Sequence, residues 1–374
     1  MKNNKNRYIS IILANILVLF SILIILEIIF GYWFKKNNFG YHMRSERNKI
    51  IKFSVNHHDN KKIDFIHKRN FYGFIGKEFD PSNVKIIFEG GSTGAEIWKP
   101  QDSSIVELLN KLLIKDNLNK KIYNASVNGK SIRGYIHDFN HWFNKIPNFN
   151  PEQVIFYVGI NDRYFHDDEL HRFYDQQHSL ILTKKIRDYI KNNSYFLGLI
   201  KKIENKYFPK NVIAYNKNKK NLYNNFQFID YKKASSLFST IDNEDIEYLK
   251  ILNHRLKELN KIIIENNIKP TFITQIKYDG VSEKRLFLVN EEIKKFSKIF
   301  NYQIIPLDEL IQDMEIGDFF DEYHTTISGS KKIASVIYKY LKLKKYLQIY
   351  IFNKLLCVIN LDVMLLKYIN TLFW

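Results

Sequence analysis

The sequence predicts a three-layer α/β/α domain built on a parallel sheet, and three observations favour it. Short apolar runs recur along the chain and are apolar on both faces, as strands buried inside a parallel sheet are. Stretches with helical periodicity lie between these runs, so that strands and helices alternate. Hydrophobic residues make up 45% of the 374 residues and aromatic residues 15%, which is enough for a substantial core. We expect the domain to span roughly residues 83–342.

An N-terminal anchor is expected before this domain. Residues 8–26 form a run of 19 residues without a charge. As a helix, this run would be about 28 Å long and would cross the hydrocarbon core of a membrane. It continues weakly through Glu27 to aromatic residues at 32–34, and no cleavage site of small residues follows. We therefore expect residues 1–36 to hold a tail and an uncleaved single-pass anchor; a removed signal sequence is the alternative.

The orientation of this anchor is predicted less directly than its span. Basic residues flank both ends, so charge alone does not favour an outer C-terminal domain. We place the N-terminus inside, because a short tail before a signal-like segment is ordinary and large downstream domains can cross despite their charge. The domain would then lie on the periplasmic or cell-surface side. The flanking basic residues are Lys2, Lys5 and Arg7 before the span, and Lys35, Lys36, Arg44, Arg47 and Lys49 after it.

Within the domain, each expected element has its own signal. Ser104 and Glu107 form a capping-box pattern that opens a helix with Ile105, Leu108, Leu109 and Leu112 facing inward. A second apolar stripe at helical spacing is interpreted as core and implies no cofactor. The expected strands are residues 84–88, 121–127, 152–160, 270–276 and 302–307, and the second stripe is Leu249, Leu252, Leu256, Leu259 and Ile263.

Three regions fall outside the strand-helix alternation. Residues 37–82 form a juxtamembrane segment. Residues 163–245 are polar and aromatic, and we interpret them as an inserted cap or loop region with some helix. Residues 343–374 are apolar but interrupted by charges at Lys354, Asp362 and Lys367, too many for a good second span. That tail is expected to be an amphipathic surface helix or an unstructured extension.

Charge and cysteine content limit the possible partners. The net charge is +18, but the lysines are spread along the chain without a dense basic tract or a recognition motif. We interpret the charge as compositional bias and expect no nucleic-acid partner. The single cysteine, Cys357, excludes an internal disulfide and any zinc site built from several cysteines.

The stretch IIFEGGSTGAE at residues 86–96 runs from an apolar strand into a glycine-rich turn. Gly90-x-Ser92-x-Gly94 matches the elbow that exposes a nucleophilic serine between a strand and a helix. The absence of a following Gly-Lys-Ser/Thr excludes a Walker phosphate loop. Taken alone, the stretch also fits a turn with an incidental serine.

Three further segments carry chemistry. Asp321 and His324 lie three residues apart before a helix whose apolar face includes Ile333, Ile337 and Leu341. NASVNG ends at Gly129 and GIND contains Asn161, and each lies at the end of an expected strand. With these four segments the sequence resembles the SGNH (GDSL-like) hydrolase superfamily, whose motifs contribute Ser, Gly, Asn and His in this order. The resemblance covers about residues 83–342, and Gly91 stands where the GDSL motif has Asp.

The resemblance implies a flavodoxin-like fold and a serine esterase that needs no cofactor or metal. Ser92 would be the nucleophile, His324 would take and return its proton, and Asp321 would orient the imidazole. The backbone N–H groups of Ser92 and Gly129 and the side-chain amide of Asn161 would form the oxyanion hole.

For one histidine-rich stretch, a metal site is the alternative to a solvated loop. The spacing of its ligand-type residues fits no standard site, and a solvated loop explains it as well. The residues concerned are His166, Asp167, Asp168 and His171; the pair His57 and His58 is interpreted in the same way.

The anchor and the juxtamembrane segment extend the resemblance to membrane-tethered SGNH proteins of bacterial surface-polysaccharide assembly. Those proteins remove or transfer O-acyl groups on sugars. The expected activity is hydrolysis of an O-acyl ester, in particular acetyl, on a carbohydrate or lipid-linked glycan. An O-acyltransferase with the same triad and a non-catalytic glycan-binding assembly protein are the alternatives. Aromatic residues of the insert would stack on sugar rings or pack the insert itself: Tyr164, Phe165, Phe173 and Tyr174.

Overall fold

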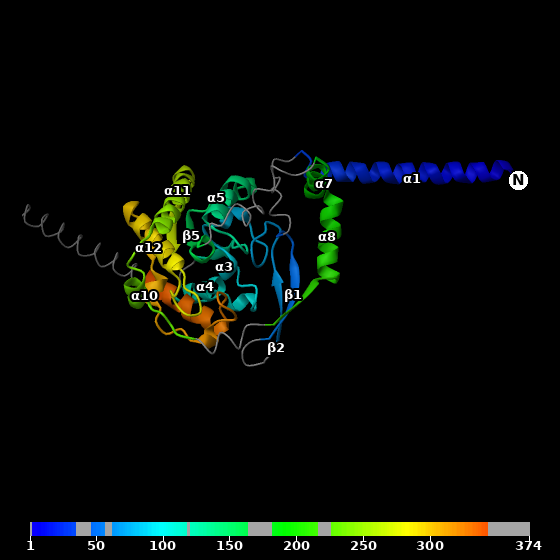
Figure 1. Cartoon of the computed structure of the whole chain (residues 1–374). Coiled ribbons are helices and arrows are strands. Elements are labelled where there is room, and N and C mark those ends of the chain that lie inside the picture. The colour runs from blue at the N-terminus through cyan, green and yellow to red at the C-terminus, as the bar shows by residue number, and fades with distance from the viewer. Residues whose placement is uncertain are drawn as a thin grey trace, which may run out of the picture.

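The centre of the molecule is a five-stranded parallel sheet (Figure 1). The computed structural model describes residues 2–34, 46–56, 62–117, 120–163, 182–215 and 226–342. The strands of this sheet are β3 (Ile86–Gly90), β4 (Ile122–Asn124), β5 (Gln153–Tyr157), β7 (Lys269–Ile273) and β8 (Gln303–Ile305). They lie in the order β4-β3-β5-β7-β8, and each neighbouring pair is parallel. Each overlaps an expected strand, so the predicted α/β fold with a parallel sheet is confirmed.

The strand order places the predicted site segments at one edge of the sheet. It is the order of a doubly wound, flavodoxin-like sheet, in which ligands bind beyond the carboxyl ends of the strands. β3 and β5 end in register at Gly90 and Tyr157, and β7 ends beside them at Ile273. The segments that follow these three residues therefore meet at the same edge.

Helices cover both faces of this sheet. The right-handed crossover from β3 to β4 puts α4 (Ile105–Lys115) on one face. The helical residues 327–342 lie beside α4, because Tyr338 and Lys342 both contact Asp116 at its end. On the other face lie α5 (Ile132–His141), α11 (Asn243–Glu265) and α12 (Lys284–Ile299), where α11 contacts both α5 and α12. Shorter helical segments are α3 (Ser92–Ala95), α10 (Tyr231–Leu237), α13 (Leu307–Leu310) and the 3₁₀ turns η1 (Pro81–Asn83), η2 (Gln101–Ser103), η3 (Phe143–Lys145), η4 (Ile160–Asp162) and η5 (Ile316–Asp318).

The two helices with predicted stripes form as expected. Ser104 Oγ caps α4 by accepting the N–H of Glu107 at 3.3 Å, and Leu109 of this helix is buried in the core. On α11 the stripe residues Leu252, Leu256 and Leu259 are fully buried against the sheet. The stripes are therefore core, as their spacing predicted.

A second, smaller sheet lies between the main sheet and the N-terminal helix. Its strands are β1 (Ile50–Asn56), β2 (Lys62–Lys68) and β6 (Lys210–Tyr215), in the order β2-β1-β6. β1 is antiparallel to β2 and parallel to β6. The sheet thus combines two strands from the juxtamembrane segment with one from the region predicted as an insert. Two helices, α7 (Leu182–Asn193) and α8 (Tyr195–Tyr207), precede β6.

The N-terminal helix α1 runs from Lys2 to Phe30 and extends away from the rest of the fold (Figure 1). Its segment Tyr8–Phe30 is long and apolar enough, by length and composition, to cross a membrane, and none of that segment is buried against the protein. The segment includes the predicted run and continues through Glu27. The tail at 343–374, by contrast, lies outside the described residues.

Candidate active site

Ser92 opens α3 directly beyond β3, at the carboxyl edge of the sheet. The residue before it is glycine for a steric reason: a Cβ at Gly91 would lie 2.0 Å from Nδ2 of Asn161 and 3.0 Å from the carbonyl oxygen of Lys130. The departure from the GDSL pattern at Gly91 therefore leaves room for Asn161. It also shows that the segments carrying Ser92, Gly129 and Asn161 converge.

Asp321 and His324 form a hydrogen-bonded pair within a compact turn. Nδ1 of His324 lies 2.8 and 2.7 Å from the two carboxylate oxygens of Asp321. One of these oxygens also accepts the backbone N–H groups of Tyr323 and His324 at 2.9 and 2.8 Å. Burial alone would raise the pKa of Asp321, but the hydrogen bond from His324 and the two backbone bonds outweigh it and lower that pKa. Because Nδ1 is held by the carboxylate, Nε2 is the nitrogen left for proton transfer.

The proposed oxyanion donors occupy two neighbouring loops. Gly129 has φ +77°, a conformation that glycine adopts without strain, and a Cβ there would meet no atom of the described residues within 4 Å. As far as the structure describes the chain, the space above Gly129 is thus open. Asn161 Nδ2 donates one hydrogen bond to the carbonyl of Lys130 at 2.8 Å. An amide nitrogen carries two hydrogens, so this bond orients the group and leaves its second hydrogen for an oxyanion.

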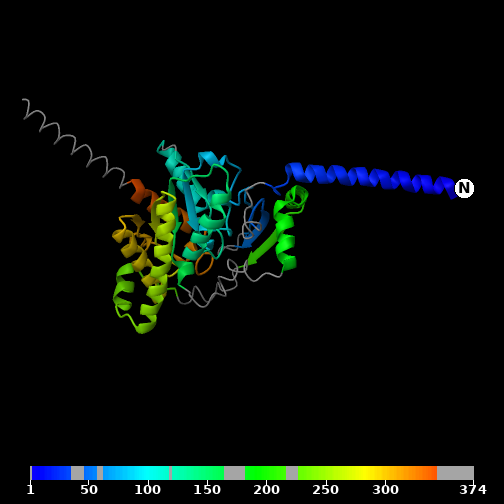
Figure 2. The ribbon, with the colours of Figure 1, turned by 90° about the horizontal axis from the view of Figure 1, so that it is seen from above.

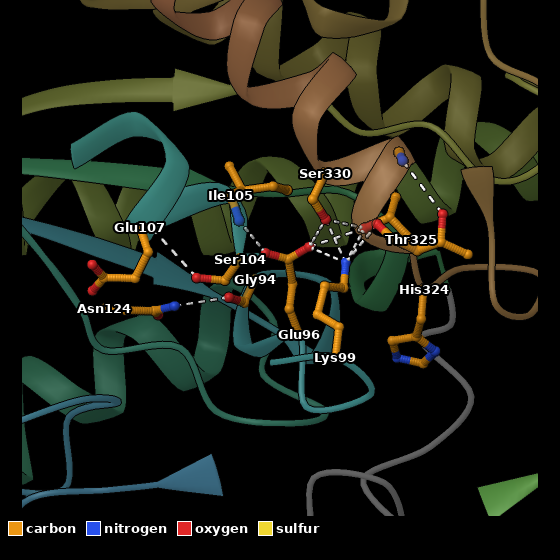
Figure 3. A network of polar contacts seen from close by, with 12 residues as sticks. Gly94, Glu96, Lys99, Ser104, Ile105, Glu107, Asn124, His324, Thr325 and Ser330 are labelled. Atoms are coloured by element: carbon orange, nitrogen blue, oxygen red, sulfur yellow. Dashed lines mark hydrogen bonds and ion pairs between the residues drawn. The ribbon is translucent and has the colours of Figure 1, made fainter. Parts of the chain in front are cut away.

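A buried polar network joins the segment after Ser92 to the segment after His324 (Figure 3). Its centre is the ion pair of Glu96 and Lys99, 2.6 Å apart, with both side chains about 1% exposed. Lys99 Nζ donates to Thr325 Oγ1 at 2.7 Å and also to Ser330 Oγ. Thr325 and Ser330 in turn donate to Oε1 of Glu96 at 2.9 and 2.5 Å. We call these four residues the clamp.

The clamp adjoins both Ser92 and His324. The N–H of Glu96 donates to the carbonyl of Ser92 at 2.9 Å, and Thr325 follows His324 directly. The Trp98 ring stands edge-on to the His324 ring, with centroids 6.3 Å apart. Sequence reasoning missed the clamp. The signal available was the i, i+3 spacing of Glu96 and Lys99, which on a surface helix is unremarkable.

The Ser92–His324 hydrogen bond itself is not formed within the described part of the chain. Nε2 of His324 is buried and has no hydrogen-bond partner there. Catalytic hydrogen bonds are often longer without substrate and tighten when it binds. The structure thus places the two residues on adjoining segments with a free Nε2.

A second buried charge group lies beneath the loop of Gly129. Lys130 Nζ donates to Glu89 at 2.9 Å and to the carbonyl of Ala125 at 3.0 Å, and it pairs with Asp138. All three charged side chains are fully buried. Burial raises the pKa of Glu89 to about 8, against the opposing effect of Lys130. Lys130 thus bridges two buried carboxyl groups and fixes the loop from below.

The GIND segment is held by its buried aspartate and by the next residue. Asp162 accepts the N–H of Ile132 at 3.0 Å, at the start of α5, and burial raises the pKa of Asp162 to about 7. The guanidinium of Arg163 stacks over the Tyr323 ring at 4.6 Å. This stacking joins the GIND segment to the turn of Asp321 and His324.

Metal ligands are not clustered in the described ranges, which contain no group of three or more His, Cys, Asp or Glu side chains able to hold an ion. The stretch with His166 and His171 lies outside the described residues, as do His57 and His58. The aromatic residues expected to stack on sugars, Tyr164 among them, also lie outside.

No family model and no curated protein matches the chain. Among solved structures, it is similar to a member of the lipolytic protein G-D-S-L family from Veillonella parvula, at 14% identity and a TM-score of 0.37, over 68% of this chain and 95% of that one. It is similar to a psychrotrophic esterase from Pseudoalteromonas sp. at 13% identity and a TM-score of 0.37, over 71% and 100%. It is also similar to an acetylxylan esterase from Geobacillus stearothermophilus, present as a catalytic mutant, at 12% identity and a TM-score of 0.38, over 69% and 93%.

Identities of 12–14% and TM-scores below 0.5 carry no functional argument. The assignment of function therefore rests on the residues of this chain.

Proposed function

We propose that the protein is a membrane-anchored serine esterase of the SGNH type. The observation that carries this proposal is the Asp321–His324 pair, which presents a free, buried Nε2 and is fastened through the clamp to the segment that begins with Ser92. The convergence of Gly91, Gly129 and Asn161 beside that serine supports an oxyanion hole.

The reaction follows from the roles of these residues. Ser92 Oγ attacks the ester carbonyl carbon while its proton passes to Nε2 of His324. The N–H groups of Ser92 and Gly129 and the amide of Asn161 stabilise the oxyanion, and the loss of one such donor typically costs about 10²–10³ in rate. Collapse of the intermediate expels the alcohol, which takes the proton from His324 and leaves an acyl-serine. Water, deprotonated by His324, then releases the acid and restores Ser92.

For the substrate, we propose an O-acyl ester, in particular acetyl, on a carbohydrate or a lipid-linked glycan. Trp98 and Tyr323 are half-buried beside His324 and its turn, and aromatic faces of this kind suit the apolar faces of sugar rings. The anchor α1 supports a single-pass membrane location. We further propose that the catalytic domain lies on the periplasmic or cell-surface side, because large domains after a short N-terminal tail can cross despite their charge. Transfer of the acyl group to a sugar hydroxyl requires the same acyl-serine intermediate. The two reactions differ only in whether water or a sugar hydroxyl takes the acyl group from Ser92.

The test uses the full chain in detergent with a fluorophosphonate probe and a short-chain aryl acetate. We expect covalent labelling that is lost in Ser92→Ala, and turnover that falls at least about 10³-fold in Ser92→Ala and His324→Ala. Ser82→Ala, at an exposed serine on η1, is the matched control and should keep both signals.

The outcomes separate the alternatives. Labelling and turnover that persist in Ser92→Ala would contradict the assignment of the nucleophile. A folded sample that shows neither would favour the non-catalytic glycan-binding protein. Sugar acceptors added to the active enzyme distinguish transfer from hydrolysis, because a transferase yields an acylated sugar in place of free acid.

A further inference from the structure

The end of α1 is fastened to the beginning of α8 by a carboxylate. Glu27 accepts the backbone N–H groups of Tyr195 and Phe196 at 2.9 and 3.1 Å, and the indole N–H of Trp33 at 3.0 Å. The N–H groups of Tyr195 and Phe196 belong to the first turn of α8, where a helix has unsatisfied donors and a partial positive charge. Rings of Phe30 and Tyr195 also pack at 5.4 Å. The position of α8 is thus set by the helix that is apolar enough to span a membrane.

The two helices run crosswise. Figures 1 and 2 view them a quarter-turn apart, and in both α8 runs across the axis of α1. In both views the small sheet and the catalytic domain lie on the side of α8 away from α1. If α1 follows the membrane normal, α8 lies parallel to the membrane plane, at the level of Glu27.

The apolar face of α8 is turned away from the domain. Asn205 donates to the carbonyl of Asn48, which precedes β1, and so marks the side of α8 that faces the protein. Ile203 and Tyr207 are each two residues from Asn205, or about 200° around the helix, and therefore lie on the opposite side. Ile200 is on that side as well. These three side chains are 58% (Ile200), 47% (Ile203) and 64% (Tyr207) exposed.

This apolar stripe continues onto α1. Phe196, one turn before Ile200, lines a groove of about 520 Å³ between the last turns of α1 and the helices α7 and α8. The groove is lined mainly by apolar side chains, including Leu23, Ile24 and Ile190. Lys206, and Lys202 one turn before it, lie along one side of the stripe, where long cationic side chains can reach lipid headgroups.

We propose that α7 and α8 form an interfacial platform that rests on the same lipid bilayer that α1 crosses. α8 lies at the boundary of headgroups and acyl chains, its stripe of Ile200, Ile203 and Tyr207 turned toward the acyl chains, and lipid tails fill the groove beside α1. The proposal depends on α1 being a membrane span and is independent of the catalytic assignment.

The platform fixes the orientation of the catalytic edge. α8 contacts β1, and Phe53 of β1 packs edge-on against Trp98 at 5.8 Å. Trp98 stacks on Phe320 at 5.7 Å and stands against His324. A continuous series of contacts therefore leads from the bilayer through the small sheet to His324.

Spin labelling of the full chain in lipid nanodiscs of phosphatidylcholine and phosphatidylglycerol tests the platform. Cys357→Ser removes the one cysteine, and labels are placed at Ile200→Cys, Ile203→Cys and Tyr207→Cys. Oxygen collides with labels in lipid and a nickel chelate with labels in water, so the two rates give depth. We expect the stripe positions about 5–10 Å below the phosphates. Ile299→Cys, at an isoleucine 65% exposed at the end of α12, is the matched control and should report water.

Two results would overturn the proposal. Nickel collision at the stripe equal to that at position 299 would place α8 in water. Dipolar broadening that grows with the number of copies per disc, together with loss of collision by both reagents, would mean that a second copy covers the stripe. The result is read from collision rates alone, so it stands whether or not the esterase assay succeeds.

Discussion

At the residue scale, the clamp is a buried ion pair that holds the segment after Ser92 against the segment after His324. Lys99 is about 1% exposed, and burial lowers its pKa while Glu96 opposes this effect. Breaking such a pair from one side leaves a buried charge without its partner, at a cost of about 3–5 kcal/mol, whereas replacing both members costs much less.

This asymmetry gives a double-mutant prediction. Lys99→Met should lower the free energy of unfolding by about 3–5 kcal/mol, and Glu96→Gln combined with Lys99→Met should recover a large part of that loss. Lys99→Met should also reduce kcat more than it changes KM, because His324 loses its position relative to Ser92. The measurement is denaturant unfolding and steady-state kinetics of the parent, of Lys99→Met, of Glu96→Gln and of the double variant.

The exposed pair of Lys250 and Glu247 serves as the control, with an expected coupling free energy below about 1 kcal/mol. Additive losses in the double variant would refute the clamp.

Asp162 gives a prediction with a defined pH window. Burial raises its pKa from 3.8 to about 7. A raised pKa means that the folded state holds the proton more tightly than the unfolded chain. The contribution of Asp162 to the free energy of unfolding is therefore fully present below pH about 4 and is lost as the pH rises toward 7. Asp162→Asn keeps an acceptor for the N–H of Ile132 but cannot ionise. The melting temperature of Asp162→Asn minus that of the parent protein should therefore become more positive as the pH rises from 4 to 8. Asp64→Asn, at an exposed carboxylate, should show little such trend; a flat difference for Asp162→Asn would contradict the burial argument.

At the element scale, α8 depends on a cap supplied from another helix. Two of its first N–H groups are satisfied by Glu27, which lies far away in the sequence. Ser194 caps the same helix locally by accepting the N–H of Leu197 at 3.1 Å. A single helix end thus has a local cap that the sequence could reveal and a remote one that only the fold reveals.

Removal of the remote cap should loosen the first turn of α8. Glu27→Ala should speed hydrogen exchange at the amides of Tyr195 and Phe196 by about tenfold or more, since hydrogen bonds to a charged acceptor are worth about 1.5–3 kcal/mol. Mass spectrometry of peptides from α8 in nanodiscs measures this effect. Glu204→Ala, at an exposed glutamate on the same helix, should leave these two amides unchanged. Equal exchange in both variants would show that Glu27 does not hold α8.

At the scale of the whole molecule, the sequence predicted the central sheet because its strands are buried on both faces and its helices carry regular stripes. The pairing of Asp321 with His324 could also be predicted, because three residues of separation suffice for a turn. The small sheet could not: β6 has few buried residues and its partner strand β1 lies in a different region of the chain. The clamp could not be predicted either, since Glu96 and Thr325 become neighbours only when the first and last strands of the central sheet are in place.

The parallel pairing of β1 with β6 has a consequence for how the chain is made. β1 and β2 can form a hairpin as soon as they leave the ribosome, but one edge of that hairpin stays open until residues 210–215 have been synthesised. Exposed edges of this kind recruit other strands, and pairings between distant segments form slowly. The edge of the hairpin therefore stays unpaired while the first strands of the central sheet are made. This edge is closed only after the Ser92, Gly129 and Asn161 segments have all been synthesised. A nascent chain interrupted before β6 therefore carries most of the candidate active site together with an unprotected strand.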